Sequence, residues 1–121
     1  MDTPAKPVVH DPLVACPLTR CMKLLKGAWA PNVIWYLREG PRRFGELRGD
    51  IPAISARVLS ARLRELESKG VVERKVHATS PPCVEYALTP LGMELVPAIE
   101  ALVEVGAKLK QSPRARRRAA T

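Results

Sequence analysis

Apolar side chains recur at helical spacing in residues 55–69 and mark one side of a predicted helix. Gaps of one, four and three residues separate them, as the 3.6-residue period of an α-helix requires. They are Val58, Leu59, Leu63 and Leu66. The pattern predicts a helix that buries one side in a core and leaves the other side free.

The free side of this helix is basic and carries small residues. Its members are Arg57, Ser60, Ala61 and Arg64. Arginine donates two hydrogen bonds to the edge of a guanine, and small residues allow a helix to approach the major groove closely. A polar helix face is more often simply solvated, and Glu65 and Glu67 lie on the same helix. On this segment alone, DNA contact and a solvated face are both open.

Prolines and glycines mark three shorter helices before this one. Pro17 suits the first position of a helix, and Gly27 supplies a stop. The predicted helices are residues 16–27, 31–37 and 44–48. Residues 49–52 form the turn into the long basic helix. Two helices joined in this way form a helix-turn-helix, whose second member commonly reads DNA bases.

A two-stranded ribbon is predicted after a left-handed helix cap at Gly70. Val72 and Val76 share one side of a strand, and apolar residues alternate with others in residues 84–88. The connection 78–83 is too long for a tight hairpin turn and contains two adjacent prolines, so we interpret the ribbon as a wing. The expected fold class is therefore mainly α with a small β-wing (α+β), a winged helix-turn-helix.

The last predicted helix follows Thr89-Pro90 and carries a long apolar stripe. The stripe consists of Leu91, Leu95, Ile99, Leu102, Val105 and Leu109. Pro97 lies within the helix and is expected to bend it or open its hydrogen-bond ladder. A small core covers only part of such a stripe, so we expect the rest to meet a second chain in a two-fold dimer formed by the terminal helices. The alternative is a helix that folds back on its own domain.

The 121 residues fit one domain. Residues 1–15 are expected to be a flexible N-terminal arm, residues 16–111 the folded domain, and residues 112–121 a disordered basic tail. The net charge of +8 favours a polyanionic partner, but four of the 20 Lys and Arg residues lie in the tail. The tail is expected to add salt-sensitive phosphate contacts at most, and it does not indicate what the domain does.

Apolar runs long enough to span a membrane are missing from the sequence, and the N-terminus lacks the apolar core of a signal peptide. We therefore expect a cytoplasmic, nucleoid-associated protein with no membrane partner. The odd number of cysteines, three, argues against a secreted disulfide scaffold and fits a reducing compartment.

Several short segments stand in a characteristic order and spacing, although none is specific alone. They are Cys16-Pro17, Lys26-Gly27-Ala28-Trp29, Gly40-Pro41-Arg42-Arg43-Phe44-Gly45-Glu46-Leu47, Ile54-Ser55, Arg62-Leu63-Arg64-Glu65-Leu66, Pro81-Pro82, Val84-Glu85-Tyr86 and Leu88-Thr89-Pro90-Leu91-Gly92. Together they make residues 16–109 resemble the HxlR-type winged-helix transcriptional regulators, relatives of the MarR-type repressors.

The resemblance implies a homodimeric bacterial regulator, with repression the favoured outcome, that binds double-stranded DNA at an inverted-repeat operator. It implies neither catalysis nor a cofactor. The DNA-binding residues expected from it are Ser55, Arg57, Ser60, Ala61 and Arg64 in the groove, and Arg42, Arg43, Arg62, Arg74 and Lys75 around it. The expected dimer interface comprises Leu18, Met22, Leu95, Ile99, Leu102, Val105 and Leu109. Trp29 is expected in the core, with the ring of Phe44 wedged near it.

Three positions depart from the family pattern. Ala61 stands where relatives often have a longer polar residue such as Gln, so a base contact is missing or replaced by contact with a thymine methyl. Cys83 replaces the arginine that usually follows the two wing prolines, which puts a wing-tip contact in doubt. Ala28 replaces a lysine before the family tryptophan.

Cys16 stands at the head of a helix, where unpaired N–H groups and the helix dipole favour a thiolate. The resemblance implies a cysteine here that senses oxidants or electrophiles, and a small molecule or an oxidant is a candidate effector. The alternative is a small apolar residue packed at the dimer seam. Cys21 is expected in the core.

Metal binding and catalysis are not expected. Four residues separate Cys16 from Cys21, but no second pair among the Cys and His residues has the gap of two to four residues that structural zinc sites use. The sequence also lacks a glycine-rich phosphate loop and a Ser/His/Asp set with a local signature. The alternative function is a winged-helix module for protein interaction or small-ligand binding without specific DNA binding.

Overall fold

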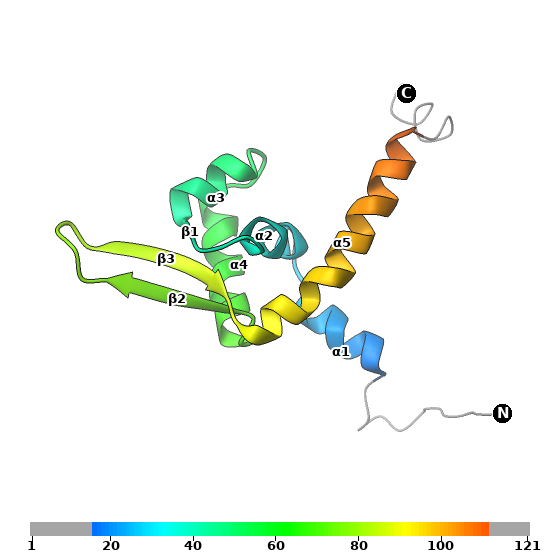
Figure 1. The fold of residues 1–121 in the computed structure, drawn as a ribbon, viewed down its shortest axis with the longest axis horizontal. Helices are drawn as coiled ribbons and strands as arrows, with labels where there is room; N and C mark the ends of the chain where they lie inside the picture. The colour runs from blue at the N-terminus through cyan, green and yellow to red at the C-terminus, as the bar shows by residue number, and fades with distance from the viewer. Residues whose placement is uncertain (1–15, 112–121) are drawn as a thin grey trace.

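The computed structural model describes residues 16–111 (Figure 1). The predicted N-terminal arm, 1–15, and basic tail, 112–121, lie outside the described residues. The elements, in chain order, are α1 (Pro17–Leu24), α2 (Ala30–Leu37), β1 (Arg42–Arg43), α3 (Phe44–Asp50), α4 (Ala56–Ser68), β2 (Val72–His77), β3 (Cys83–Leu88) and α5 (Pro90–Gln111). None of the described helices is both long enough and apolar enough to cross a membrane.

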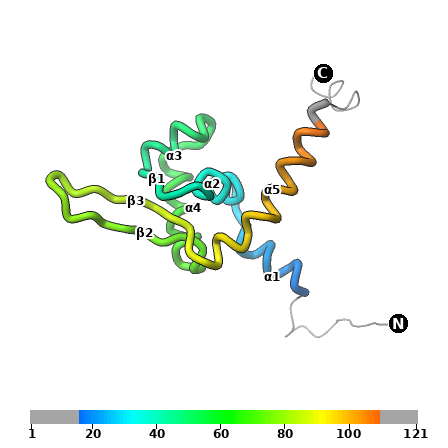
Figure 2. The backbone as a smooth tube through the Cα atoms, viewed as in Figure 1, coloured from blue at the N-terminus to red at the C-terminus, as the bar shows by residue number. Residues whose placement is uncertain are grey.

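The predicted winged helix-turn-helix is confirmed. Helices α3 and α4 form the helix-turn-helix, and β2 and β3 pair as an antiparallel ribbon in the register Val72 with Leu88 through His77 with Cys83. Gly70 ends the α4 segment with a φ of +79°, as its predicted left-handed cap requires. The ribbon extends from one side of the molecule, whereas α1 and the end of α5 extend from the other (Figures 1 and 2).

A third strand, β1, was not predicted from the sequence. It places Arg42 opposite Tyr86 and Arg43 opposite Glu85, so that β3 lies in the middle of a three-stranded sheet. A strand of two residues is too short to show an alternating pattern, and only its pairing partner defines it. The strand holds the start of α3 against the base of the wing.

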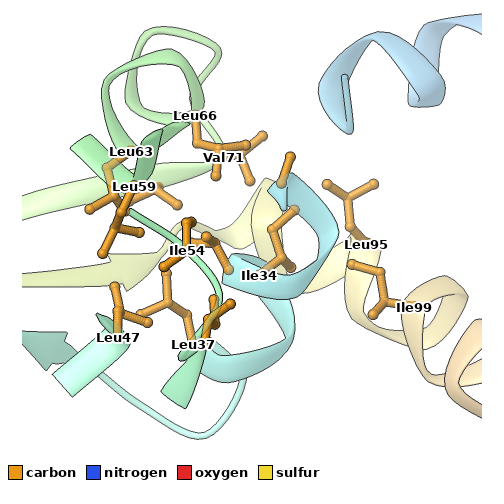
Figure 3. Close-up of a cluster of buried hydrophobic side chains, with 14 of the residues drawn as sticks. Ile34, Leu37, Leu47, Ile54, Leu59, Leu63, Leu66, Val71, Leu95 and Ile99 are labelled. Carbon is orange, nitrogen blue, oxygen red and sulfur yellow. The ribbon is translucent and has the colours of Figure 1, made fainter. Parts of the chain in front are cut away.

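The core forms where α2, α3 and α4 meet (Figure 3). Its fully buried side chains include Ile34, Leu37, Leu47, Leu59, Leu63 and Leu66. Trp29 and Phe44 pack against this core while partly buried. The apolar stripe of α4 therefore faces inward as predicted, which turns its basic side away from the core.

Two residues expected at the dimer interface belong to this core instead. Leu95 and Ile99 are 6% and 3% exposed, because the first half of α5 packs on α2 within the same chain. The expectation for both residues is therefore corrected. The second half of α5 differs, since every residue from 101 to 109 is exposed. Pro97, itself exposed, does not interrupt the helix, which runs unbroken to Gln111.

Helix α1 is shorter and more exposed than expected. It ends at Leu24 rather than near Gly27, and none of its residues is buried. Cys21, expected in the core, is exposed. The prediction was wrong because an amphipathic pattern identifies an apolar face without showing which surface covers it.

The start of α5 is fixed closely against the start of the wing. Thr89 caps the helix by accepting a hydrogen bond from the N–H of Gly92 at 3.1 Å, and the N–H of Thr89 donates to the carbonyl of Val71 at 3.0 Å. A Cβ atom at Gly92 would collide with that carbonyl oxygen and would lie 3.0 Å from a methyl group of Leu88. The contact therefore requires glycine.

We predict that Gly92→Ala destabilises the fold by about 1 to 3 kcal/mol through this overpacking. Chemical denaturation at matched protein concentrations measures the loss. Gly49→Ala is the control, because Gly49 is also helical and has open space around it. Equal stability of the two variants would contradict the close approach at Gly92.

Candidate DNA-binding interface

Ser55 begins the predicted reading helix and caps it. Its Oγ accepts a hydrogen bond from the N–H of Val58 at 3.1 Å, which satisfies one of the free donors at the start of α4. The hydroxyl keeps its own proton for donation. Ser55 is exposed, so this proton is available to a ligand on the outside of the helix.

The outer face of α4 carries the other four residues predicted to lie in the groove. Arg57 and Arg64 are exposed, whereas Ser60 and Ala61 are half-buried. At about 100° per residue, these positions lie across the helix from the buried leucine stripe. The structure thus brings the predicted set together on one surface.

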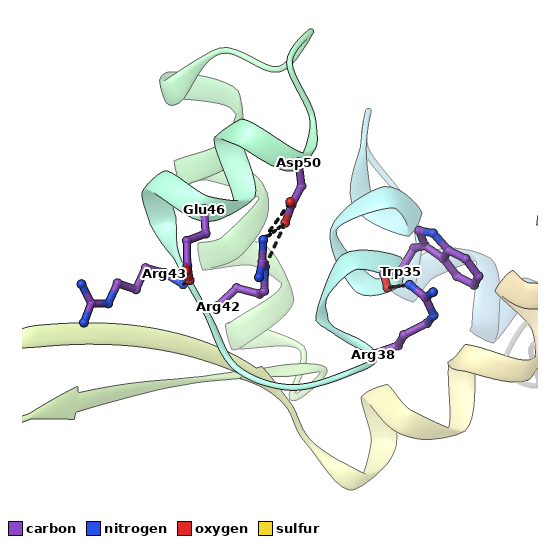
Figure 4. Close-up of polar contacts among 6 residues, drawn as sticks. All are labelled: Trp35, Arg38, Arg42, Arg43, Glu46 and Asp50. Atoms are coloured by element: carbon purple, nitrogen blue, oxygen red, sulfur yellow. Dashed lines mark hydrogen bonds and ion pairs between the residues drawn. The ribbon is translucent and has the colours of Figure 1, made fainter.

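Arg42, expected to contact phosphate, is paired with a carboxylate of its own chain. Its Nε and Nη2 atoms donate to the two carboxylate oxygens of Asp50 at 2.9 and 2.8 Å (Figure 4). The two side chains are 35% and 20% exposed. This two-pronged pair joins Arg42, two residues before the start of α3, to the last residue of α3, so Arg42 braces the short helix.

Arg62 was also expected at the phosphate backbone, and its guanidinium group is likewise bound within the protein. Its Nε donates to the carbonyl of Ala28 at 2.9 Å, and its Nη1 lies 2.6 Å from a carboxylate oxygen of Glu65. Its side chain is only 19% exposed. Arg42 and Arg62 thus both have partners within the protein, which distinguishes them from Arg57 and Arg64; phosphate contact at these two residues stays a prediction.

Arg38 is a third arginine with an internal role. Its guanidinium group lies 3.5 Å from the centre of the Trp35 ring, and its Nη1 donates to the carbonyl of Trp35 at 2.8 Å (Figure 4). A cation over an indole face is an attractive contact. The guanidinium group of Arg38 therefore contacts Trp35 of α2 and is not part of the outer face of α4.

Exposed cations remain at the base and along the edge of the wing. Arg43 is exposed, and its backbone N–H donates to the carboxylate of Glu46 at 2.8 Å, which fixes the start of α3. Arg74 and Lys75 are exposed on β2. Residues directly opposite in an antiparallel ladder share a face, so Lys75 and Arg43 flank Glu85 on one side of the sheet.

The sequence did not predict the role of Glu85 at the centre of this face. Besides its two cationic neighbours, its carboxylate lies 2.7 Å from Nε2 of His77. Only the register of three strands brings these groups together. The alternation of charges along β2 and β3 was the available signal, but it does not specify the register.

The tip of the wing forms a cavity with the start of α3. The cavity has a volume of about 580 Å³, and its lining includes Arg43, Phe44, Pro81 and Cys83. Cys83 is half-buried, so it turns partly toward the protein at the position where relatives were expected to carry an arginine. The wing tip therefore has an open space beside it, and it carries a thiol at the position where the family pattern predicts an arginine.

Cys16 immediately precedes α1 and is exposed. The backbone N–H groups of Thr19 and Leu18 lower the pKa of its thiol below the ordinary value, because they stabilise the thiolate. The side chain of Thr19 and the charge of Arg20 act in the same direction. Accessibility and a lowered pKa are the two properties that a reactive cysteine needs.

Exposed apolar side chains gather on the two helices that extend from the body. Leu18 and Met22 of α1 are 68% and 55% exposed. On the second half of α5 the exposed set is Leu102, Val103, Val105 and Leu109. A cavity of about 350 Å³ beside this set lies between α2 and α5, with Trp35, Tyr36 and Leu102 in its lining.

Among the described residues, no three His, Cys, Asp or Glu side chains gather closely enough to hold a metal ion.

Comparison with known proteins agrees with this architecture. The HxlR-like helix-turn-helix family model matches residues 24–113. YdeP, an uncharacterized HTH-type transcriptional regulator of Bacillus subtilis, is 38% identical over 100 residues, which cover 83% of this chain and 78% of that protein.

Two solved structures of regulators share the fold. The redox regulator HypR in its oxidized form has a TM-score of 0.73 and 36% identity, and the match covers 77% of this chain and 96% of that one. The reduced form of the transcriptional regulator YodB from B. subtilis has a TM-score of 0.67 and 36% identity, over 75% of this chain and 90% of that one. On this evidence the chain belongs to the HxlR-like helix-turn-helix family of transcriptional regulators.

Proposed function

We propose that this regulator acts as a homodimer that binds an inverted-repeat operator through α4 and represses transcription. The observation that carries the proposal is the outer face of α4, where Arg57 and Arg64 are exposed and none of the ion pairs found among the described residues involves them. Free guanidinium groups on an exposed helix provide the donors that guanine edges accept in the major groove.

The wing supports the same surface from the side. Arg43, Arg74 and Lys75 are exposed cations, and phosphate contacts of this kind orient a protein on the duplex without reading its sequence. The proposed division of roles is therefore base reading by α4 and backbone contact by the wing and the start of α3. A two-fold dimer places two copies of α4 about one helical turn, roughly 34 Å, apart.

We predict that Arg57→Ala or Arg64→Ala lowers affinity for the operator by about 1 to 3 kcal/mol and relaxes base preference. Arg43→Ala is the matched control, since loss of a phosphate contact weakens all sequences alike. The operator is obtained by selection from a random DNA pool, and affinities are measured on it and on unrelated duplexes.

Equal losses on operator and unrelated DNA for Arg57→Ala would remove this residue from the base-reading set. A parent protein that selects no duplex, and binds DNA only weakly and without salt dependence, would favour a winged-helix module for protein or ligand binding.

The apolar faces of α1 and α5 support the dimer. The side chains of Leu102, Val105 and Leu109 lie at spacings of three and four residues and are more than half exposed. An exposed apolar stripe of this kind marks an interaction surface. We propose that a second copy of the chain covers it, together with Leu18 and Met22 of α1.

We predict that Leu102→Asp converts the dimer to folded monomers at micromolar concentration, because a carboxylate would be buried without a partner. Sedimentation measures the assembly. Val76→Asp is the control, since Val76 on the wing is 59% exposed and Leu102 is 58% exposed. A monomeric parent, or dissociation by both substitutions, would overturn the proposed interface.

We further propose that Cys16 makes the regulator responsive to oxidants or electrophiles. HypR is named a redox regulator, and the solved form of YodB is described as reduced. In this chain the thiol is exposed and its pKa is lowered by the first N–H groups of α1, so a larger share is thiolate at neutral pH. Helix α1 also carries part of the proposed dimer surface, which links thiol chemistry to the spacing of the two α4 helices.

We predict that diamide reduces operator binding by the parent but not by Cys16→Ser, and that a thiol reductant restores it. Binding is measured by fluorescence anisotropy on the selected duplex. Cys21→Ser, which keeps Cys16, is the matched control and should respond like the parent. Full affinity of a parent whose Cys16 is shown by mass spectrometry to be modified would exclude the sensor role.

The lowered pKa provides a second check on the same thiol. The thiolate is the reactive form, so alkylation of Cys16 in a Cys21→Ser/Cys83→Ser variant should rise through a midpoint below about 8.5, the ordinary thiol value. The same variant in denaturant loses the N–H groups of α1 and should return to that value. Identical midpoints in the two conditions would show that α1 does not activate the thiol.

A further inference from the structure

Two long-range hydrogen bonds join α4 and its C-cap residue to α1 and the turn that follows it. Arg62 Nε donates to the carbonyl of Ala28 at 2.9 Å, and Lys69 Nζ donates to the carbonyl of Lys23 at 2.8 Å. Their partners are 34 and 46 residues away along the chain. Both acceptors are backbone carbonyl groups, so these bonds hold the backbone itself and do not depend on which side chains Lys23 and Ala28 carry.

The turn between α1 and α2 is shaped around the guanidinium group of Arg62. Gly27 has a φ of +105°, and a Cβ atom there would lie 2.9 Å from Arg62 Nε and 3.0 Å from its Cζ. Trp29, the residue before α2, also has a positive φ, of 72°. A left-handed conformation is unusual for tryptophan and persists only where its surroundings hold it. The turn and the arginine therefore fit one another closely.

The position of Arg62 on α4 separates it from the outer face. Arg62 and Lys69 are half-buried and lie on the same flank of the helix, whereas Arg57 and Arg64 are exposed on the opposite side from the core. The Nη1 atom of Arg62 lies 2.6 Å from Glu65, which fixes the planar group from its other end. Two of the three guanidinium nitrogens, Nε and Nη1, are thus bound within the protein.

Helix α1 depends on this connection because it has no buried residues of its own. Leu24 and Leu25, at and just after its end, pack partly on the core, and the Arg62 and Lys69 bonds add polar attachment on either side of them. The contacts of this short stretch of chain therefore determine the orientation of α4 relative to α1.

We propose that Arg62 is a positioning residue of the DNA-reading helix, which it holds at a fixed angle to the α1–α2 turn, with Lys69 as a second attachment. Arg62 acts through Ala28 and does not contact DNA. The inference rests on the proposed function, in which α4 reads bases and α1 lies at the dimer interface. In that dimer, the attachment sets the spacing and relative angle of the two α4 helices.

A pair of nearly isosteric substitutions separates positioning from phosphate contact. The Nε2 atom of glutamine occupies the same place along the side chain as Nε of arginine, so Arg62→Gln retains the donor to Ala28. Arg62→Met has a similar length and no donor. Both substitutions remove the same charge, so loss of a phosphate contact would affect both equally.

The measurements are affinity for the duplex selected by the parent, the dependence of that affinity on salt, and the penalty for adding or removing one base pair between the half-sites. We expect Arg62→Gln to bind within about twofold of the parent. Arg62→Met should bind about tenfold more weakly, as when the competent orientation falls to roughly a tenth of the population. Its salt dependence should equal that of the parent, and its penalty for altered spacing should be smaller.

Gly27→Ala provides a test without any change of charge. Its added methyl displaces the Arg62 guanidinium group, so we expect the same weak binding and loss of spacing preference as in Arg62→Met. Gly40→Ala is the control for backbone strain, because Gly40 has a φ of +148° with nothing near its Cβ position. This variant should bind like the parent, and circular dichroism checks that each variant is folded.

Equal losses in Arg62→Gln and Arg62→Met, with a salt slope reduced by about 0.9, would show a phosphate contact and overturn the proposal. Parent-like binding by both Arg62→Met and Gly27→Ala would overturn it as well. If Arg62→Met does not fold, the comparison of operator binding by Gly27→Ala with that by Gly40→Ala tests the proposal instead. A folded parent that selects no duplex refutes the proposed function itself, and this outcome is distinct because it appears before any variant is compared.

Discussion

The packing of the α4 leucine stripe on α2 is the constraint on which the rest of the structure depends. Leu59, Leu63 and Leu66 are at most 1% exposed, and they meet Ile34 and Leu37 in the same core. Rotation of α4 by one residue, about 100°, would expose this stripe and bury a guanidinium group. Apolar burial on one side therefore fixes which side chains face outward, and the chemistry of that outer face follows from it.

The sequence was sufficient to predict the helix-turn-helix, the wing and the outer face of α4, because each rests on a local period or a cap. It was not sufficient to assign partners to the arginines. Arg42, Arg43 and Arg62 were given the same expected role in the sequence, but Asp50 and the Ala28 carbonyl bind the guanidinium groups of Arg42 and Arg62. Charge is visible in a sequence, whereas its neutralisation by a distant group depends on the folded chain.

The same distinction explains the errors on apolar residues. Leu95 and Leu102 belong to one stripe in the sequence, yet Leu95 is 6% exposed and Leu102 is 58% exposed. The difference arises because α5 is longer than the body on which it packs, and helix periodicity carries no information about where that body ends. Cys21 was misplaced for a related reason, since no other described residue covers the apolar face of α1 enough to bury it.

The absence of buried residues in α1 gives it a further property. A helix of eight residues is marginal in water by itself, so its order depends on what packs against it. If a second chain supplies that packing, the helical state of α1 follows mass action and rises with the amount of protein. The N–H groups that activate Cys16 are aligned only while α1 is helical. On the proposed redox role of Cys16, the reactivity of the thiol would then depend on the cellular abundance of the regulator, so that the same dose of oxidant would have different effects in cells that hold few copies and in cells that hold many.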